Sequence, residues 1–338
     1  MSYSSIEGDA WDVIATVQTG PCEPTGGSWL MTTLSLPIVR RRLIQLSAHL
    51  VVAVVALVVI GGATRVMEAG LACPDWPLCY GTLLPGKQMN AQVFLEWFHR
   101  LDAFIVGMAL LVQAIVSVVW RRLLPRWMPW LSLALVGMVA LQGGLGALTV
   151  LQLLPSGIVT AHLVLALTLV ALLSGLTQRL QQSVGVSAPL WWRGLSLLAL
   201  VAVIGQSLLG ARMATTWSAQ RCLSGGGACQ WVSLHRTTAM PVAGVVLVFV
   251  VVALLAGGWA RRQWPLLAFV SALVLGQVAL GITTFRLGLS QPYVTISHQL
   301  LAALLVAVLA ALAARCPDQP PVHSPVVVDG TTLETCHG

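Results

Sequence analysis

The sequence has very few charged side chains for its length. Only 9% of its 338 residues are Asp, Glu, Lys or Arg, whereas 57% are hydrophobic. Soluble domains carry roughly 25% charged residues, so this composition excludes a water-exposed surface over most of the chain and indicates a lipid environment. The net charge of +7 does not indicate a nucleic-acid partner, because the basic residues stand singly or in short clusters between apolar runs.

The apolar residues form long runs without alternation. A helix that crosses a bilayer needs roughly 20 mostly apolar residues, and backbone groups cannot stay unpaired in hydrocarbon. The sequence therefore predicts an all-α membrane protein with eight transmembrane helices. We expect them at 43–63, 97–119, 128–151, 158–177, 194–211, 233–257, 264–285 and 294–314.

The basic residues predict the orientation of these helices. Most of the 18 Lys and Arg residues fall on one side when the helices are laid out in order. Cytoplasmic loops are enriched in Lys and Arg, so both termini are expected in the cytoplasm.

The two ends of the chain do not follow the membrane pattern. Residues 1–39 are expected to be a disordered extension and cytoplasmic lead-in without the apolar core of a signal peptide, and Met31 is an alternative start to Met1. Residues 316–338 are Pro-rich and are expected to be a disordered tail. No role is assigned to the His and Cys residues there, which are Cys316, His323, Cys336 and His337.

The chain contains an internal repeat. The same spacing separates His99 from His162 and His235 from His298. Neighbouring segments recur as well: Leu145–Val150 resembles Leu280–Phe285, Gly62–Arg65 resembles Gly210–Arg212, and a cysteine pair lies in a long outer loop of each half. This pattern predicts two tandem, pseudo-symmetric four-helix bundles in the same orientation, at 40–180 and 181–315.

The repeated histidines are the strongest candidates for a cofactor site. Each half has one histidine at the start of its second helix and one near the start of its fourth, both towards the outer side. Two histidines facing each other across a four-helix bundle can hold a heme. Two imidazoles without a nearby thiolate are an incomplete zinc set, and Gly107, Gly143, Gly144 and Gly146 could open a slot for a flat ring. His49 has no counterpart in the other half, so no role is assigned to it.

Arginines gather at the same outer end as the histidines. They are Arg65, Arg100, Arg212, Arg236 and Arg286. Arginine suits paired carboxylates, so the first four are expected to bind heme propionates. For Arg286, an alternative explanation is that its long side chain extends to the polar membrane interface and does not bind a propionate.

The two halves differ in one acidic residue. Glu96 lies three residues before His99 and hence on the same helical face, whereas Val232 stands at the matching position of the second half. A carboxylate beside a heme ligand can handle a proton or a developing charge. The first half is therefore expected to be catalytic, with Asp102 either supporting the site or solvated at the membrane edge.

These residues resemble those of a known family. Gly61–Arg65, Ala69–Leu71, Cys73–Cys79 and Glu96–Arg100, taken in this order, are similar to the motifs of the heme A synthases, and the resemblance covers about 40–315. Some members separate the first cysteine pair by six residues, whereas five intervene here, which bears on the geometry of this loop.

The resemblance implies an enzyme that oxidises the C8 methyl group of heme O to a formyl group by successive hydroxylations. It implies that His99 and His162 ligate the iron of the substrate heme, that Glu96 is catalytic, and that His235 and His298 ligate heme b. Heme O synthase is the expected supplier of the substrate, and an unidentified electron acceptor and a homo-oligomer are further candidate partners. The expected location is a bacterial-type inner membrane or another energy-converting membrane, with the heme sites towards the outer face. A di-heme b-type electron carrier and a heme transporter or chaperone are the alternatives.

The four loop cysteines are expected to form two disulfides. Cys73 and Cys79, like Cys222 and Cys229, lie close in sequence on the outer, oxidising side. Zinc bound by all four thiolates is disfavoured because each spacing exceeds the usual two to four residues. A structural role is expected for the second pair, and the first pair is open between a structural and a redox role.

Overall fold

The computed structural model describes residues 28–182, 187–225 and 229–317. Most of the expected N-terminal extension and nearly all of the expected C-terminal tail, with His323, Cys336 and His337, lie outside these residues. Cys316 is described, and its buried thiol accepts a hydrogen bond from Nη1 of Arg179 at 2.6 Å.

The described chain is helical, in agreement with the predicted fold class. The helices are α1 (Ser28–Val66), α2 (Ala91–Val119), α3 (Trp127–Leu151), α4 (Ser156–Gln181), α5 (Leu190–Thr215), α6 (Ser218–Leu223), α7 (Gln230–Leu255), α8 (Gly258–Arg261), α9 (Trp264–Arg286) and α10 (Pro292–Ala314). Among the described residues, eight helices are long and apolar enough to cross a membrane, all except α6 and α8. The predicted number of spans is therefore confirmed.

Most helix ends lie slightly outside the predicted spans, because a helix continues into the polar membrane interface. The first helix begins at Ser28, so residues 28–39 of the expected extension are helical. The sixth span, α7, begins at Gln230 and ends at Leu255 rather than at residue 257. Gly257, two residues after its end, has a φ of +71°, a backbone conformation that favours glycine.

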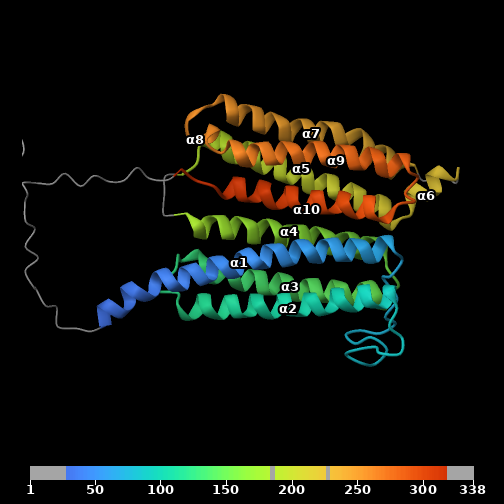
Figure 1. The fold of residues 1–338 in the computed structure, drawn as a ribbon, viewed down its shortest axis with the longest axis horizontal. Helices are drawn as coiled ribbons and strands as arrows, with labels where there is room; N and C mark the ends of the chain where they lie inside the picture. The colour runs from blue at the N-terminus through green and yellow to red at the C-terminus, as the bar shows by residue number, and fades with distance from the viewer. Residues whose placement is uncertain (1–27, 183–186, 226–228, 318–338) are drawn as a thin grey trace, which may run out of the picture. The chain divides into compact units, whose positions relative to one another are not determined.

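The long helices run side by side, with α6 and the loop after α1 at one end and α8 at the other (Figure 1). In the second half, contacts between successive neighbours close a ring of α5, α7, α9 and α10. In the first half, α2 contacts α3 and α3 contacts α4. A buried hydrogen bond of 3.0 Å from Ser47 to Gln113 joins α1 to α2.

The two halves contact each other through equivalent helices. In the first half α4 packs against α5 and α10. Across the same boundary α1 approaches α10 so closely that a Cβ placed on Gly62 would lie 1.4 Å from Oε1 of Gln299. The described residues from Val39 onwards belong to one compact unit. These contacts agree with a tandem pair of bundles, and the assignment of one heme site to each half stays a prediction.

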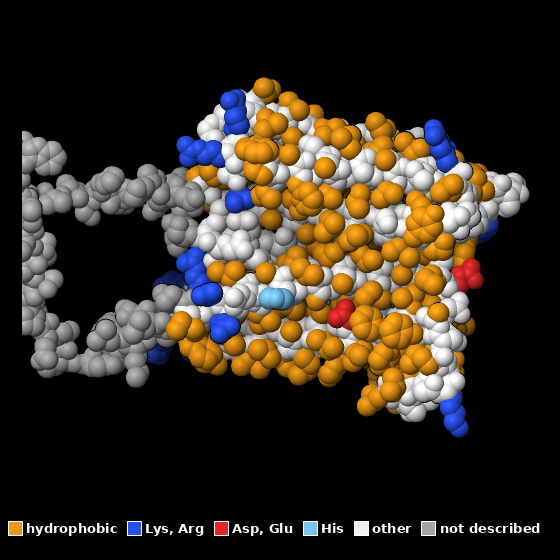
Figure 2. Space-filling view, viewed as in Figure 1, with side chains coloured by type: hydrophobic (Ala, Val, Ile, Leu, Met, Phe, Trp, Pro, Cys, Tyr) orange, Lys and Arg blue, Asp and Glu red, His pale blue; other side chains and the backbone are white. Residues whose placement is uncertain are grey.

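The surface of the long helices is apolar. Figure 2 shows hydrophobic side chains over the broad face between the two ends, while Lys and Arg side chains gather towards the ends. This distribution is typical of a protein whose middle faces lipid and whose ends face water.

The end of the second half that carries α8 is held together by one large buried side chain. Trp192 of α5 is fully buried. Its ring packs edge-on against Phe249 of α7 and at a tilt against Trp259 of α8, with ring centroids 5.1 and 4.8 Å away. Its Nε1 donates a 2.8 Å hydrogen bond to the backbone oxygen of Leu312 on α10. One residue thus joins four helices.

We expect Trp192→Ala to lower the free energy of unfolding by about 3 kcal/mol, because the cavity removes packing contacts and the hydrogen bond from the indole to the Leu312 carbonyl is lost. Reversible unfolding in mixed detergent micelles would measure this change. Trp130→Ala is the matched control, since the Trp130 side chain is 75% exposed. Equal losses for the two variants would contradict the assigned role.

Candidate functional site

Each of the four repeated histidines packs against a glycine on a neighbouring helix. A Cβ placed on that glycine would lie close to the imidazole Cε1. The pairs and distances are Gly61 with His99 at 3.1 Å, Gly146 with His162 at 3.5 Å, Gly210 with His235 at 3.1 Å, and Gly281 with His298 at 3.2 Å. At three of the four positions a methyl group would be tighter than ordinary contact. We call these glycine positions the histidine notches.

The notches correct one sequence-based interpretation. Gly61, not Gly62, is the counterpart of Gly210, because each of them adjoins the first histidine of its half. A Cβ placed on Gly107, Gly143 or Gly144 would meet open space, so their expected role in opening a ring slot stays a prediction. The signal for the notches was present as repeated glycines, but which glycine adjoins a histidine depends on helix rotation.

The histidines fall into two pairs, one in each half. His99 and His162 lie close enough for their charges to interact, and so do His235 and His298. All four side chains are partly buried, and the buried Nδ1 atoms of His99, His162 and His298 have no hydrogen-bond partner.

These pairs fit a heme in each half. A buried ring nitrogen without a partner is costly, whereas an iron-bound imidazole uses one nitrogen for the metal and carries a hydrogen on the other. No cluster of three or more His, Cys, Asp or Glu that could hold a metal ion occurs within residues 28–182, 187–225 and 229–317. Two histidines per half therefore suit the two axial positions of a heme better than a zinc site.

Three of the predicted propionate-binding arginines make contacts across helices near this end. Nη2 of Arg65 donates to the Ala214 backbone oxygen at 2.6 Å, and its guanidinium lies 3.9 Å from the Trp217 ring centroid. The guanidinium carbons of the other two arginines also lie near aromatic ring centroids, that of Arg212 at 5.3 Å from Trp231 and that of Arg236 at 4.4 Å from Phe285. Nη1 of Arg212 also donates to the hydroxyl of Ser156 at 3.3 Å. Within the described part of the chain, none of the three forms a direct ion pair, although Glu68 lies close enough to Arg65 for their charges to interact.

Arg100 and Glu96 hold the first cysteine loop on α2. Nη2 of Arg100 contacts Oε1 of Glu96 at 2.5 Å, and its Nη1 donates to the Asp75 backbone oxygen at 2.6 Å. Oε2 of Glu96 accepts a hydrogen bond of 2.8 Å from the Cys73 backbone N–H. Glu96 is 5% exposed, so this is a buried ion pair bonded to a loop. Both residues thus connect the loop to the helix that carries His99.

Both predicted disulfides are present. Cys73 is bonded to Cys79, and Cys222 to Cys229, with Cα–Cα distances of 4.8 and 5.0 Å. The first pair is buried against Val93 near the start of α2. A redox role for this pair remains a prediction.

Asp75, which had no assigned role at the sequence level, orders the same loop. Its carboxylate accepts hydrogen bonds from the backbone N–H groups of Gly81 at 2.8 Å and Tyr80 at 2.6 Å. These bonds, chiefly that of Gly81, lower the pKa of Asp75. The carboxylate is therefore charged wherever the loop is folded at neutral pH.

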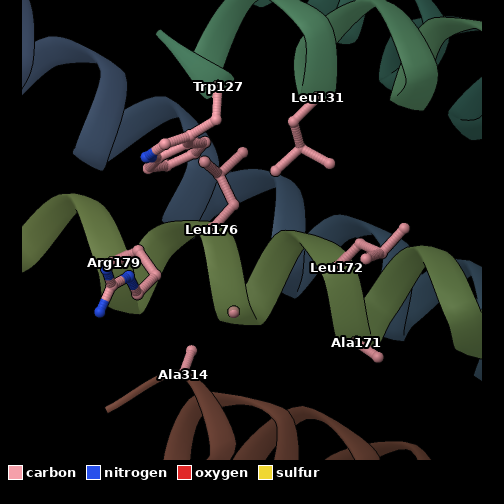
Figure 3. A pocket seen from close by; sticks show the side chains of 8 residues that line it. Trp127, Leu131, Ala171, Leu172, Leu176, Arg179 and Ala314 are labelled. Carbon is pink, nitrogen blue, oxygen red and sulfur yellow. The ribbon is translucent and has the colours of Figure 1, made fainter. Parts of the chain in front are cut away.

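A cavity of about 370 Å³ lies at the other end of the helices. Figure 3 shows apolar side chains of α3 and α4 around it, with Arg179 at its edge and Ala314 of α10 below. At 1.5 Å per residue, Arg179 is about 25 Å from His162 along α4. The cavity is therefore separate from the histidine site.

Comparison with known proteins identifies the family. Residues 44–312 match the COX15-CtaA model, described as cytochrome oxidase assembly protein. A heme A synthase of Sphingopyxis alaskensis is 30% identical, covering 76% of this chain and 87% of the relative, and one of Caulobacter vibrioides is 31% identical, covering 82% and 96%. A heme A synthase-mitochondrial ferredoxin fusion protein of Schizosaccharomyces pombe is 29% identical over 36% of this chain and 24% of the fusion. The chain therefore belongs to the COX15-CtaA family of cytochrome oxidase assembly proteins.

Proposed function

We propose that this protein is a heme A synthase, an oxidoreductase that converts the C8 methyl group of heme O to the formyl group of heme A. The observation that carries the proposal is the pair of histidines in each half, packed into the histidine notches near one end of the membrane helices. Relatives that cover most of the chain are named heme A synthases. Two heme sites suit an enzyme that binds a substrate heme and keeps a resident heme, whereas a carrier of a single heme needs only one site.

The first half is the proposed substrate site. His99 and His162 would ligate the iron of heme O, and His235 and His298 that of a resident heme b, which supplies a centre for one-electron transfer. Arg65, Arg212 and Arg236 form no direct ion pair among the described residues and are proposed to receive propionates. Arg100 is a weaker candidate for this role, because its donors already bind Glu96 and the loop carbonyls.

Glu96 is proposed to act in catalysis through its position next to His99. Its carboxylate is buried and paired with Arg100, and it also accepts a hydrogen bond from the Cys73 N–H of the loop. A buried carboxylate at this place can hold a proton or stabilise positive charge when the methyl group is oxidised. The contacts with the loop also close this end of the site against water.

The reaction indicates the proposed partners, and the basic residues indicate the proposed orientation. If the formyl oxygen comes from water, oxidation of the methyl group releases electrons to an acceptor, and if it comes from dioxygen, a donor must supply electrons. An electron carrier is therefore a proposed partner in either case, and the ferredoxin fusion of the relative in Schizosaccharomyces pombe supports it. Heme O synthase would supply the substrate, and a homo-oligomer is a further candidate. The chain is an integral multi-pass membrane protein. Its basic residues favour cytoplasmic termini and heme sites towards the outer face.

We expect His235→Ala and His298→Ala each to abolish the low-spin b-type absorption spectrum of the purified protein, because one axial ligand is lost. His49→Ala is the control, since this exposed α1 histidine contacts only the Gln45 backbone oxygen among its described partners. Visible spectra of the reduced proteins would measure the effect. An unchanged spectrum in both ligand variants would show that the ligand assignment is wrong.

Two substitutions at Glu96 separate its proposed chemical role from its structural one. Glu96→Gln keeps an acceptor for the Cys73 N–H but removes the charge, whereas Glu96→Ala removes both. A catalytic carboxylate predicts that both variants lose heme A formation by about 100-fold or more while heme binding persists. Mass analysis of extracted hemes measures the products, and limited proteolysis of residues 67–90 reports on the loop. Normal heme A formation in Glu96→Gln would restrict Glu96 to holding the loop.

A further inference from the structure

A glutamine accompanies three of the four histidine notches. Gln142 precedes Gly146, Gln206 precedes Gly210 and Gln277 precedes Gly281, each by one helical turn and on the same helix face. The corresponding residue before Gly61 is Leu57. The notch of His99 therefore differs from the other three in one side chain.

The three glutamines all contact their histidines. Nε2 of Gln206 lies 3.1 Å from Nδ1 of His235 and donates to the backbone oxygen of the same residue at 2.7 Å. Nε2 of Gln277 lies 3.3 Å from Nε2 of His298. Nε2 of Gln142 donates to the His162 backbone oxygen at 3.0 Å.

Two of these glutamines leave complementary atoms unpaired. Oε1 of Gln142 and Nδ1 of His162 are both buried without a hydrogen-bond partner, and the same is true of Oε1 of Gln277 and Nδ1 of His298. An imidazole whose Nε2 binds iron carries its hydrogen on Nδ1 and needs an acceptor there. A side-chain amide supplies either an acceptor or a donor when it turns by half a rotation. Gln206 already lies at Nδ1 of His235, so it needs only this half rotation to present an acceptor there. Gln277 contacts Nε2 of His298 and Gln142 contacts the His162 backbone oxygen, so these two side chains must also shift to reach Nδ1 when iron is bound.

His99 has no such acceptor in its notch. Leu57 is aliphatic and packs against the hydrophobic core. Nδ1 of His99 is buried and lacks a hydrogen bond among the described residues. The carboxylate of Glu96, three residues before His99, is already bonded to Arg100 and to the Cys73 N–H.

We propose that Gln142, Gln206 and Gln277 are positioning residues that hold the second ring nitrogen of their histidines, and that His99 is the axial ligand left free to detach. This proposal rests on the proposed function. A resident heme in the second half is then held by two oriented imidazoles. The first half, which must admit a substrate heme and release its product, would have one imidazole held by a hydrogen bond and one, His99, held by its notch alone.

The test uses the full-length, heme-loaded protein and matched substitutions. Gln277→Leu places in the second half the residue that occurs naturally beside His99, and Leu57→Gln does the reverse in the first half. Gln277→Glu keeps an acceptor. Gln113→Leu is the control, because Gln113 is a buried glutamine that bonds Ser47 and adjoins no histidine notch.

Two quantities are measured: the midpoint potential of heme b, and the rate at which each heme moves to excess apomyoglobin. Heme b and heme O or A are separated by chromatography, so each half is followed on its own. A hydrogen-bonded imidazole is a stronger donor to ferric iron, so Gln277→Leu should make the potential more positive and release heme b at least about tenfold faster. Gln277→Glu should reverse both changes, and Leu57→Gln should slow release from the first half by a similar factor.

The outcomes distinguish this proposal from the function on which it rests. Unchanged potential and release rate in Gln277→Leu and in Gln206→Leu would overturn the positioning role. Unchanged release from the first half in Leu57→Gln would overturn the assignment of His99 as the detaching ligand. Changes of the same size in Gln113→Leu would also overturn the proposal, because they would show a general loss of packing. Absence of any heme from the unaltered protein would overturn the proposed function as well.

Discussion

The close contact between an imidazole and a glycine, made four times between neighbouring helices, is the interaction on which the site depends. A bilayer provides no water to satisfy a ring nitrogen, so each histidine must find its partners within the protein or on a bound metal. A glycine lets the ring lie against the backbone of the next helix, and at three of the four notches a single methyl group would crowd it. The helix spacing and the direction of each ligand are therefore set by the same contact.

The polar end of the first half is organised by a second constraint, the buried pair of Glu96 and Arg100. A buried charge pair is stable only when its remaining hydrogen-bonding groups are satisfied, and the backbone of the Cys73–Cys79 loop satisfies them. The disulfide shortens the loop and presents its N–H and carbonyl groups to α2. The acidic residue that distinguishes the first half is thus part of the structure that places a loop beside His99.

Much of the fold could be predicted because lipid imposes a simple rule on the sequence. Runs of apolar residues long enough to span a bilayer have one folding solution, so the eight spans were found within a few residues, and α7 ended two residues before Gly257, whose φ is positive. The repeat identified the two histidine pairs and both cysteine pairs. Helix rotation was not predictable in the same way, because nearly all residues of these helices are apolar and no polar face marks the interior. For this reason the sequence matched Gly62, rather than Gly61, with Gly210.

By itself, the sequence determined the class of protein, the number of spans, the repeat, the four histidines and the disulfides. Each of these follows from composition or from spacing along one chain. Only the tertiary structure decided that Gly61 rather than Gly62 adjoins His99, that Arg100 bonds the cysteine loop, and that glutamines accompany three histidines while Leu57 accompanies the fourth. These contacts join residues on different helices, and their partners are chosen by the rotation and approach of helices that the pattern within any one helix does not record.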